Sequence, residues 1–316
     1  MHKRTPPNIS GIYAALPTPF DSDGRPCLEI LTPLVDFLLA EGMEGFCLGG
    51  ATGEYAAIGI EERISLFQSL AGYIHGRAQL IMGTGGEHCA QVRRLALAAA
   101  DSGAIAALLP TAGFLPYQQD DLVDFIGQVS AEMPLPVILY HIPQCTRDLG
   151  IHHILDLIGT IPNIIGLKDS SGQKENLPLI EAALAQVPMV FLMGSDDLLL
   201  EAFARGAVGA ISGIASACPE LILPVYRNWR EGNLQAAKAR QGILDEFIAH
   251  IRDIPSPWVV KLALQVRGFE IGNLAWPMGS RLHGEAKRFQ DWFSSWLENG
   301  ETAWARAPLK ASPHRP

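Results

Sequence analysis

The stretch NIIGLKDSSG, residues 163–172, places Lys168 at the end of an apolar run. Lys3 is the only lysine that precedes it in the chain. A short run that is apolar throughout predicts a strand buried on both faces. A lysine at the end of such a strand is unusual, because burial disfavours the charged ammonium.

Seven more runs of this kind occur along the chain. Together with 164–168, the predicted strands are 12–16, 45–49, 79–84, 104–109, 136–141, 190–194 and 209–213. Segments of helical period separate and follow them, at about 29–41, 61–74, 87–101, 118–131, 151–160, 176–186, 196–205 and 219–231. Eight strand–helix units with uniformly apolar strands predict an α/β fold, a (β/α)8 TIM barrel. An open doubly wound sheet is the alternative, but no GxGxxG follows the first strand.

The pattern divides the chain into three parts. Residues 1–232 are predicted to form the barrel. Residues 233–300 carry helical patterns at about 234–250, 257–268 and 282–297 and are predicted to form a C-terminal helical extension. Residues 301–316 are rich in Pro and Ala and are expected to be a disordered tail.

Composition narrows the class of protein. The net charge of −9 over 316 residues argues against a nucleic-acid binder, which usually has a basic face. No apolar run approaches the roughly 20 residues that span a bilayer, so no membrane association is expected. The five cysteines include no CxxC pair and the histidines no HExxH. These features predict a reduced, cytoplasmic protein without disulfides and without a metal.

Polar residues follow several of the predicted strands, and in a barrel these ends converge on one mouth. Lys168 ends the sixth strand, Tyr140 lies near the end of the fifth, and residues 50–54 (GATGE) follow the second. An unprotonated lysine attacks a carbonyl and forms a Schiff base, and a nearby phenol can move protons. The alternatives are that Lys168 extends to solvent or pairs with Asp169, and that Tyr140 is an ordinary strand aromatic.

These residues together resemble the dihydrodipicolinate synthase/N-acetylneuraminate lyase family of pyruvate-dependent class I aldolases. The resemblance covers about residues 9–230. The motifs that carry it are LPTPF (16–20), GATGE (50–54), YHIP (140–143), IIGLKDSSG (164–172) and GSDD…GAISG (194–213).

The resemblance implies a covalent Schiff base between Lys168 and a 2-keto acid such as pyruvate, with no separate cofactor. It implies that Tyr140 relays protons, and that Thr52 with the neighbouring amides of Ala51 and Gly53 holds the keto acid's carboxylate. The other residues expected at the substrate are Gly194, Ile211 and Ser170. Proteins of this family are usually homo-oligomers, so a dimer or tetramer is expected.

Three positions depart from the family pattern. Ala51 stands where a second hydroxyl residue is common, and Thr111-Ala112-Gly113 stands where a tyrosine often follows the proline of the fourth strand. Both changes are expected to break or reroute the proton relay from Tyr140. Cys145 stands where the synthase branch has an arginine for its second substrate, with Arg147 as a nearby candidate.

The expected function is therefore a lyase or aldolase that releases or consumes pyruvate, but not a true dihydrodipicolinate synthase, because a bidentate carboxylate clamp is missing. The apolar runs AALLPTAGFLP (106–116) and YHIPQC (140–145) suggest a less polar mouth than a sugar acid favours. Two alternatives stay open: a dehydratase of a 2-keto-3-deoxy sugar acid that uses the same imine, and a non-catalytic paralogue that binds keto acids.

Overall fold

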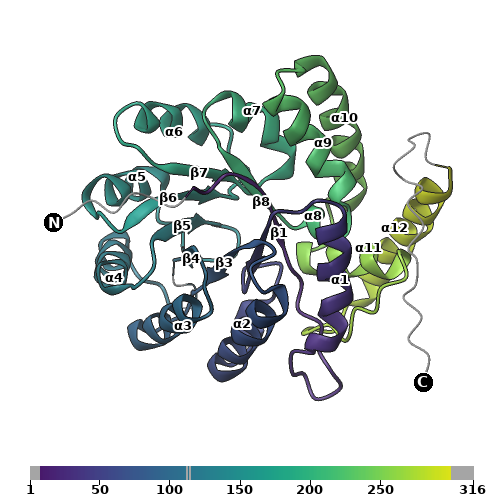
Figure 1. The fold of residues 1–316 in the computed structure, drawn as a ribbon, viewed down its shortest axis with the longest axis horizontal. Coiled ribbons are helices and arrows are strands. Elements are labelled where there is room, and N and C mark those ends of the chain that lie inside the picture. Colours follow the sequence, from purple (N-terminus) through teal and green to yellow (C-terminus); the bar gives the residue numbers. More distant parts are fainter. Residues whose placement is uncertain (1–7, 112, 114, 300–316) are drawn as a thin grey trace.

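The computed structural model describes residues 8–111, 113 and 115–299, and its centre is a closed barrel of parallel strands (Figure 1). The strands are β1 (Gly11–Ala15), β2 (Gly45–Leu48), β3 (Gln79–Gly83), β4 (Ala106–Pro110), β5 (Val137–His141), β6 (Ile164–Asp169), β7 (Val190–Met193) and β8 (Gly209–Ser212). They pair in chain order, and β8 pairs with β1 to close the barrel. The predicted (β/α)8 fold is confirmed.

Side chains along each strand alternate between the barrel interior and the surrounding helices. The interior cluster includes Ile81, Leu108, Ile138 and Leu192, all of them fully buried. Leu167 of β6 points the other way and packs in the larger core between the strands and the helices. Because Lys168 follows Leu167, its side chain belongs to the barrel interior.

Helices ring the barrel and cover the outer face of the sheet (Figure 1). They are α1 (Leu28–Ala40), α2 (Ile60–Ile74), α3 (Cys89–Asp101), α4 (Gln119–Glu132), α5 (Ile151–Thr160), α6 (Asn176–Leu184), α7 (Leu199–Ala204) and α9 (Pro219–Arg230). Three short helices also follow strands: η1 (Tyr55–Ala57), η2 (Asp196–Leu198) and α8 (Ile214–Ala217). These three were not predicted as separate helices, because three or four residues are too few to show a helical period.

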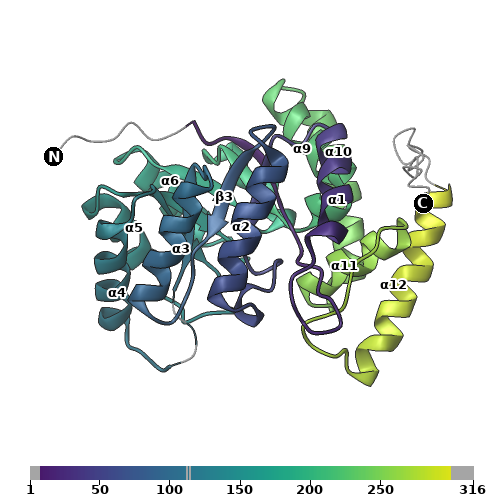
Figure 2. The ribbon, with the colours of Figure 1, turned by 60° about the horizontal axis from the view of Figure 1, so that its bottom comes forward.

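The C-terminal extension consists of α10 (Leu234–Ile251), α11 (Ser256–Val266) and α12 (Ser280–Asn299), and Figure 2 shows α11 and α12 on the same side of the barrel as α1. Aromatic rings join α12 to α10. The ring of Phe247 lies 5.9 Å from Phe289, 5.9 Å from Trp292 and 5.6 Å from Phe293, measured between centroids. Phe289 and Phe293 are also buried in the same cluster as the outer barrel residues, so the extension shares one hydrophobic core with the barrel.

The predicted element boundaries are close to the observed ones. The start of the fourth strand differs more than most: it was predicted at residue 104, and β4 begins at Ala106. The helix predicted at 196–205 divides into η2 and α7. The expected tail, residues 301–316, lies outside the described residues. Within the described part of the chain, no helix has the length and apolar character needed to cross a membrane.

Candidate active site

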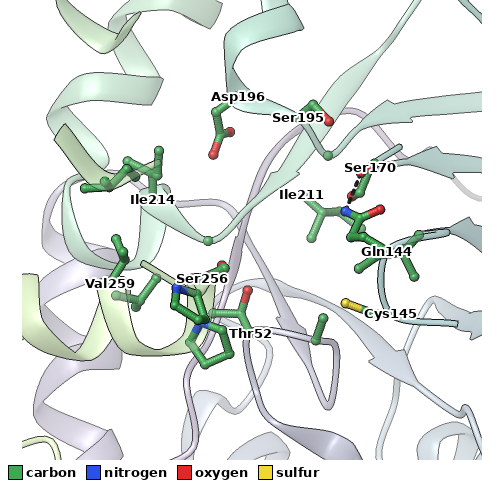
Figure 3. Close-up of a pocket in the computed structure, with 18 of the residues that line it drawn as sticks. Thr52, Gln144, Cys145, Ser170, Ser195, Asp196, Ile211, Ile214, Ser256 and Val259 are labelled. Carbon is green, nitrogen blue, oxygen red and sulfur yellow. Dashed lines mark hydrogen bonds between the residues drawn. The ribbon is translucent and has the colours of Figure 1, made fainter. Parts of the chain in front are cut away.

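A cavity of about 600 Å³ lies at the carboxyl ends of the strands (Figure 3). Its floor comes from the barrel, and residues of α10 and α11 form another side. The predicted site residues that line the cavity are Ala51, Thr52, Tyr140, Lys168, Ser170, Gly194 and Ile211. The fold thus brings together residues from five strands, β2, β5, β6, β7 and β8, and from the loops that follow them.

Lys168 lies inside the barrel next to Tyr140. The two residues are opposite each other in the β5–β6 pairing, and each side chain is almost fully buried. The Nζ atom of Lys168 lies 4.0 Å from the centroid of the Tyr140 ring. No carboxylate pairs with Lys168 among the residues that the structure describes. Both alternatives considered for this lysine, exposure to solvent and a pair with Asp169, therefore differ from the structure.

Asp169 instead points away from the cavity and bonds to His141. The Nδ1 atom of His141 is 3.0 Å from Asp169 Oδ1, and its Nε2 atom is 3.1 Å from Asp148 Oδ1. Burial lowers the pKa of His141, but the two carboxyl partners outweigh this effect and raise it above its usual value. Because His141 follows Tyr140 and Asp169 follows Lys168, this contact fixes β5 against β6 directly behind the phenol and the amine.

Gly194, at the end of β7, makes room for the lysine. A Cβ atom at this position would lie 2.8 Å from Cε of Lys168 and 1.9 Å from Oγ of Ser170. Both distances are too short for non-bonded atoms. The absence of a side chain at residue 194 is therefore a steric condition for the position of the amine.

The turn after β2 presents Thr52 to the cavity. The N–H of Gly53 donates to the carbonyl of Gly50, and the hydroxyl of Thr18 donates to the carbonyl of Gly53 at 2.8 Å. Gly53 is not among the cavity residues, so it supports the turn rather than the ligand. The N–H groups of Ala51 and Thr52 donate to no carbonyl within the described residues, which leaves them available to an anion.

Glu54 ties this turn to the C-terminal extension. Its carboxylate forms an ion pair with Lys261 of α11 at 2.5 Å, and the lysine and glutamate side chains are 1% and 8% exposed. The other carboxylate oxygen accepts from the N–H of Ala275 at 3.3 Å. Lys261 also donates to the carbonyl of Asn273. The position of Thr52 thus depends on residues more than 200 positions further along the chain.

Asp196 is a cavity residue to which the sequence assigned no role. Burial raises its pKa from its ordinary value to about 7, and one carboxyl oxygen has no hydrogen-bond partner in the described structure. Gln144 and Ser256 line the same cavity. The GSDD motif was the available signal for Asp196. Ser256 had none, because it reaches the barrel mouth only through the packing of α11.

Of the three departures from the family pattern, Ala51 and Cys145 line the cavity, whereas Thr111 bonds to the loop after β5. Thr111 Oγ1 lies 2.8 Å from Thr146 Oγ1 and 2.5 Å from the carbonyl of Arg147, while Ala112 is outside the described residues. The Nε atom of Arg147 donates to the carbonyl of Leu115, and Arg147 is not among the cavity residues. Cys145 does line the cavity, so a thiol stands where a guanidinium was expected in the synthase branch.

The described residues contain no group of three or more His, Cys, Asp or Glu side chains placed to hold a metal ion. The polar groups of the cavity include an amine, a phenol, hydroxyls and carboxyls. With a buried amine beside a phenol, the arrangement is suited to imine chemistry on a carbonyl compound.

A model of the dihydrodipicolinate synthetase family matches residues 8–294. The chain belongs to this family. Members of the family are lyases of the class I aldolase type, which is consistent with a carbon–carbon lyase.

Individual relatives agree with this assignment. The 4-hydroxy-tetrahydrodipicolinate synthase of Bacillus subtilis (strain 168) is 31% identical over 277 residues, covering 86% of this chain and 93% of the relative. YagE, a prophage protein of the dihydrodipicolinic acid synthase family from E. coli K12 solved in complex with pyruvate, has a TM-score of 0.84 at 25% identity. That match covers 92% of this chain and 98% of YagE. An N-acetylneuraminate lyase from Mycoplasma synoviae, with a TM-score of 0.77 at 18% identity over 90% of this chain and 97% of that one, shares the fold.

Proposed function

We propose that this protein is a Schiff-base-forming aldolase that cleaves or forms a carbon–carbon bond with pyruvate as product or donor. The observation that carries the proposal is the amine of Lys168, buried in the cavity, 4.0 Å from the ring of Tyr140 and without a carboxylate partner among the described residues. A buried amine that has no ion-pair partner is available to act as a nucleophile. The complex of YagE with pyruvate supports a keto acid as the ligand.

The first step joins the lysine to the keto acid. The unprotonated Nζ of Lys168 attacks the ketone carbon, Tyr140 supplies the proton with which the carbonyl oxygen leaves as water, and a protonated imine forms. The hydroxyl of Thr52 and the N–H groups of Ala51 and Thr52 are the groups that would hold the carboxylate. They are suited to this role because the turn leaves them without carbonyl partners in the described structure.

In the cleavage direction, the second step breaks the bond between C3 and C4 of a 4-hydroxy-2-keto acid. Tyr140 relays the proton of the C4 hydroxyl, and this oxygen becomes the carbonyl of the departing aldehyde. The electron pair of the broken bond moves onto the imine and gives an enamine. Protonation at C3 and hydrolysis then release pyruvate and restore Lys168. The condensation runs through the same steps in reverse.

We further propose that the partner aldehyde is not the one used by the synthase branch, although several relatives carry the synthase name. Cys145 lines the cavity where that branch has an arginine, and Arg147 does not reach the lining. A thiol cannot form the paired hydrogen bonds that a guanidinium gives to a carboxylate. The protein is therefore expected to show little turnover in the synthase reaction.

Trapping of the imine tests the central claim. The protein is incubated with pyruvate, reduced with sodium borohydride and weighed by mass spectrometry. We expect the mass of one reduced pyruvate adduct per chain in the wild type and no adduct in Lys168→Ala. Peptide mapping should place the adduct on residue 168.

Lys174→Ala is the matched control for the trapping experiment. Lys174 lies six positions further on, but its side chain is 65% exposed and pairs with Glu201, so this variant should form the adduct as the wild type does. An adduct that persists in Lys168→Ala, or no adduct with pyruvate or any other 2-keto acid, contradicts the proposal.

A further inference from the structure

The part of the cavity that α8, α10 and α11 form carries six aliphatic side chains beside the polar residues Arg252 and Ser256. The six are Ile214 of α8, Ile248 and Ile251 of α10, Ile254, and Val259 and Val260 of α11. We call these six residues the aliphatic wall. Figure 3 shows two of them, Ile214 and Val259, across the cavity from Gln144 and Ser170.

The cavity is larger than the keto-acid end requires. Thr52, Tyr140 and Lys168 meet at the barrel floor, whereas the aliphatic wall extends along α10 and α11. A volume of about 600 Å³ is in the range of pockets that enclose a whole small ligand. The space beside the aliphatic wall is therefore available to the aldehyde half of the substrate.

The charged side chains of the cavity disfavour a negatively charged aldehyde. Asp196 and Asp197 both line it, and the half-buried Asp196 has one buried carboxyl oxygen without a hydrogen-bond partner in the described structure. Besides Lys168, Arg252 is the cation that the lining supplies, and this residue is exposed. An exposed guanidinium is screened by water and salt and gives little selectivity for an anion.

A polyhydroxylated chain is equally disfavoured beside the aliphatic wall. Isoleucine and valine side chains neither donate nor accept hydrogen bonds, so each hydroxyl that faces them loses its water without a replacement. An apolar chain in the same position gains from leaving water. The wall therefore discriminates between aldehydes by the polarity of their carbon chain.

From these contacts we infer that the partner of pyruvate is an apolar aldehyde, aliphatic or aromatic, bound against the aliphatic wall. This inference rests on the proposed Schiff-base function. In cleavage, the substrate is a 4-hydroxy-2-keto acid with an apolar group on C4. Its C3–C4 bond breaks, the C4 hydroxyl loses its proton and becomes the aldehyde, and the electron pair passes to the imine of Lys168 before C3 is protonated.

Matched aldehydes test the inference on the whole enzyme. Butanal and erythrose have the same carbon chain and differ in hydroxyl groups, and benzaldehyde is the aromatic case. Condensation with pyruvate is followed by pyruvate loss and by mass spectrometry of the product. We expect kcat/KM to be roughly tenfold or more higher for butanal and benzaldehyde than for erythrose. Preference for erythrose overturns the inference.

Two variants connect this preference to the wall. Ile248→Asn adds polarity to the half-buried Ile248 side chain, and Val259→Thr keeps the shape of valine but adds a hydroxyl. Each should raise KM for butanal by roughly tenfold. Leu234→Asn is the matched control on α10, because Leu234 is 51% exposed and outside the cavity. If Ile248→Asn does not fold, Val259→Thr still tests whether the aliphatic wall sets the preference for an apolar aldehyde. An unchanged KM in a folded wall variant contradicts the inference.

Borohydride trapping with pyruvate alone separates the two proposals. The wall variants should trap pyruvate as the wild type does, because neither substitution changes Lys168, Tyr140 or Thr52. If the wild type forms no adduct, the Schiff-base function itself is wrong. If it forms the adduct but prefers erythrose, only the inferred aldehyde class is wrong.

Discussion

Lys168 shows how a single side chain obtains its place from its neighbours. Tyr140 lies across the strand pair beside it, and Gly194 leaves the space that its alkyl chain occupies. On the other face of the same strands, His141 and Asp169 are hydrogen-bonded and buried. The sequence predicted a lysine at a strand end and its tyrosine neighbour. It did not predict the outward contact, which depends on the registration of β5 against β6.

Gly194→Ala tests the space around the amine. The added Cβ would lie 1.9 Å from Oγ of Ser170 and 2.8 Å from Cε of Lys168, so both side chains must move, while their ends are flexible enough for the backbone to stay in place. A displacement of about 1 Å at a reacting group can cost roughly 10²-fold in rate. We expect pyruvate trapping to slow by about that factor, with a small change in melting temperature.

Gly72→Ala is the matched control for this substitution. Gly72 lies in α2, is exposed, and has no atom within 4 Å of the position of an added Cβ. Trapping should be unchanged, and the helix should be slightly stabilised. Equal trapping rates in Gly194→Ala and the wild type would show that residue 194 does not position the lysine.

At the scale of elements, the turn after β2 and helix α11 form one unit through the Glu54–Lys261 pair. Lys261 is 1% exposed, and its ammonium also lies 4.8 Å from the centroid of the Phe20 ring. Burial lowers the pKa of Lys261, and Glu54 opposes this effect. The pair joins the barrel to its extension next to Thr52, so the turn that carries Thr52 is held from outside the barrel.

Lys261→Met is expected to destabilise the fold and to loosen the turn that carries Thr52. Removal of the cation leaves Glu54 buried without its partner, which typically costs about 3–5 kcal/mol of unfolding free energy. We also expect a higher pyruvate concentration for half-maximal trapping, because the turn that carries Thr52 loses its anchor. Urea unfolding and the trapping titration measure the two effects.

The double variant Glu54→Gln/Lys261→Met distinguishes the pair from lost packing. It should recover part of the stability, because no buried charge remains unpaired. Lys287→Met is the surface control, since Lys287 is 78% exposed in its pair with Asp291, and it should change stability little. If the double variant is no more stable than Lys261→Met, the stability lost in Lys261→Met comes from packing alone.

At the scale of the whole molecule, the barrel and the extension share a core. Phe293 of α12 and Val260 of α11 belong to the same buried cluster as Leu167 of β6 and Val35 of α1. All six tryptophans lie at or beyond residue 229, five of them from Trp258 onward. Tryptophan fluorescence thus reports mainly on the extension, whereas far-UV circular dichroism reports on the whole chain.

Because of the shared core, we expect the two signals to show the same midpoint in urea. Trp229→Phe removes the tryptophan of barrel helix α9, so that the remaining fluorescence comes from Trp258 and later residues. The midpoints should still coincide in this variant. Separate transitions would show that the extension unfolds on its own.

The sequence by itself determined the class of fold and the position of the buried lysine, Lys168. Uniformly apolar strands alternating with helical segments are local patterns, and they sufficed to predict the eight strands and the lysine at the end of the sixth. The cavity residues predicted from motifs also lie close to their strand ends. Local patterns suffice for this because a strand that is buried on both faces is apolar at consecutive residues.

Tertiary structure alone decided the second half of the cavity. Ile248, Val259 and Ser256 reach the barrel mouth because α10 and α11 pack there, and Lys261 finds Glu54 across more than 200 residues. Such contacts leave no period in the sequence, since they depend on how distant helices pack. That packing sets the side of the site where we propose that the partner aldehyde binds, whereas the strand ends set the side where we propose that the keto acid binds.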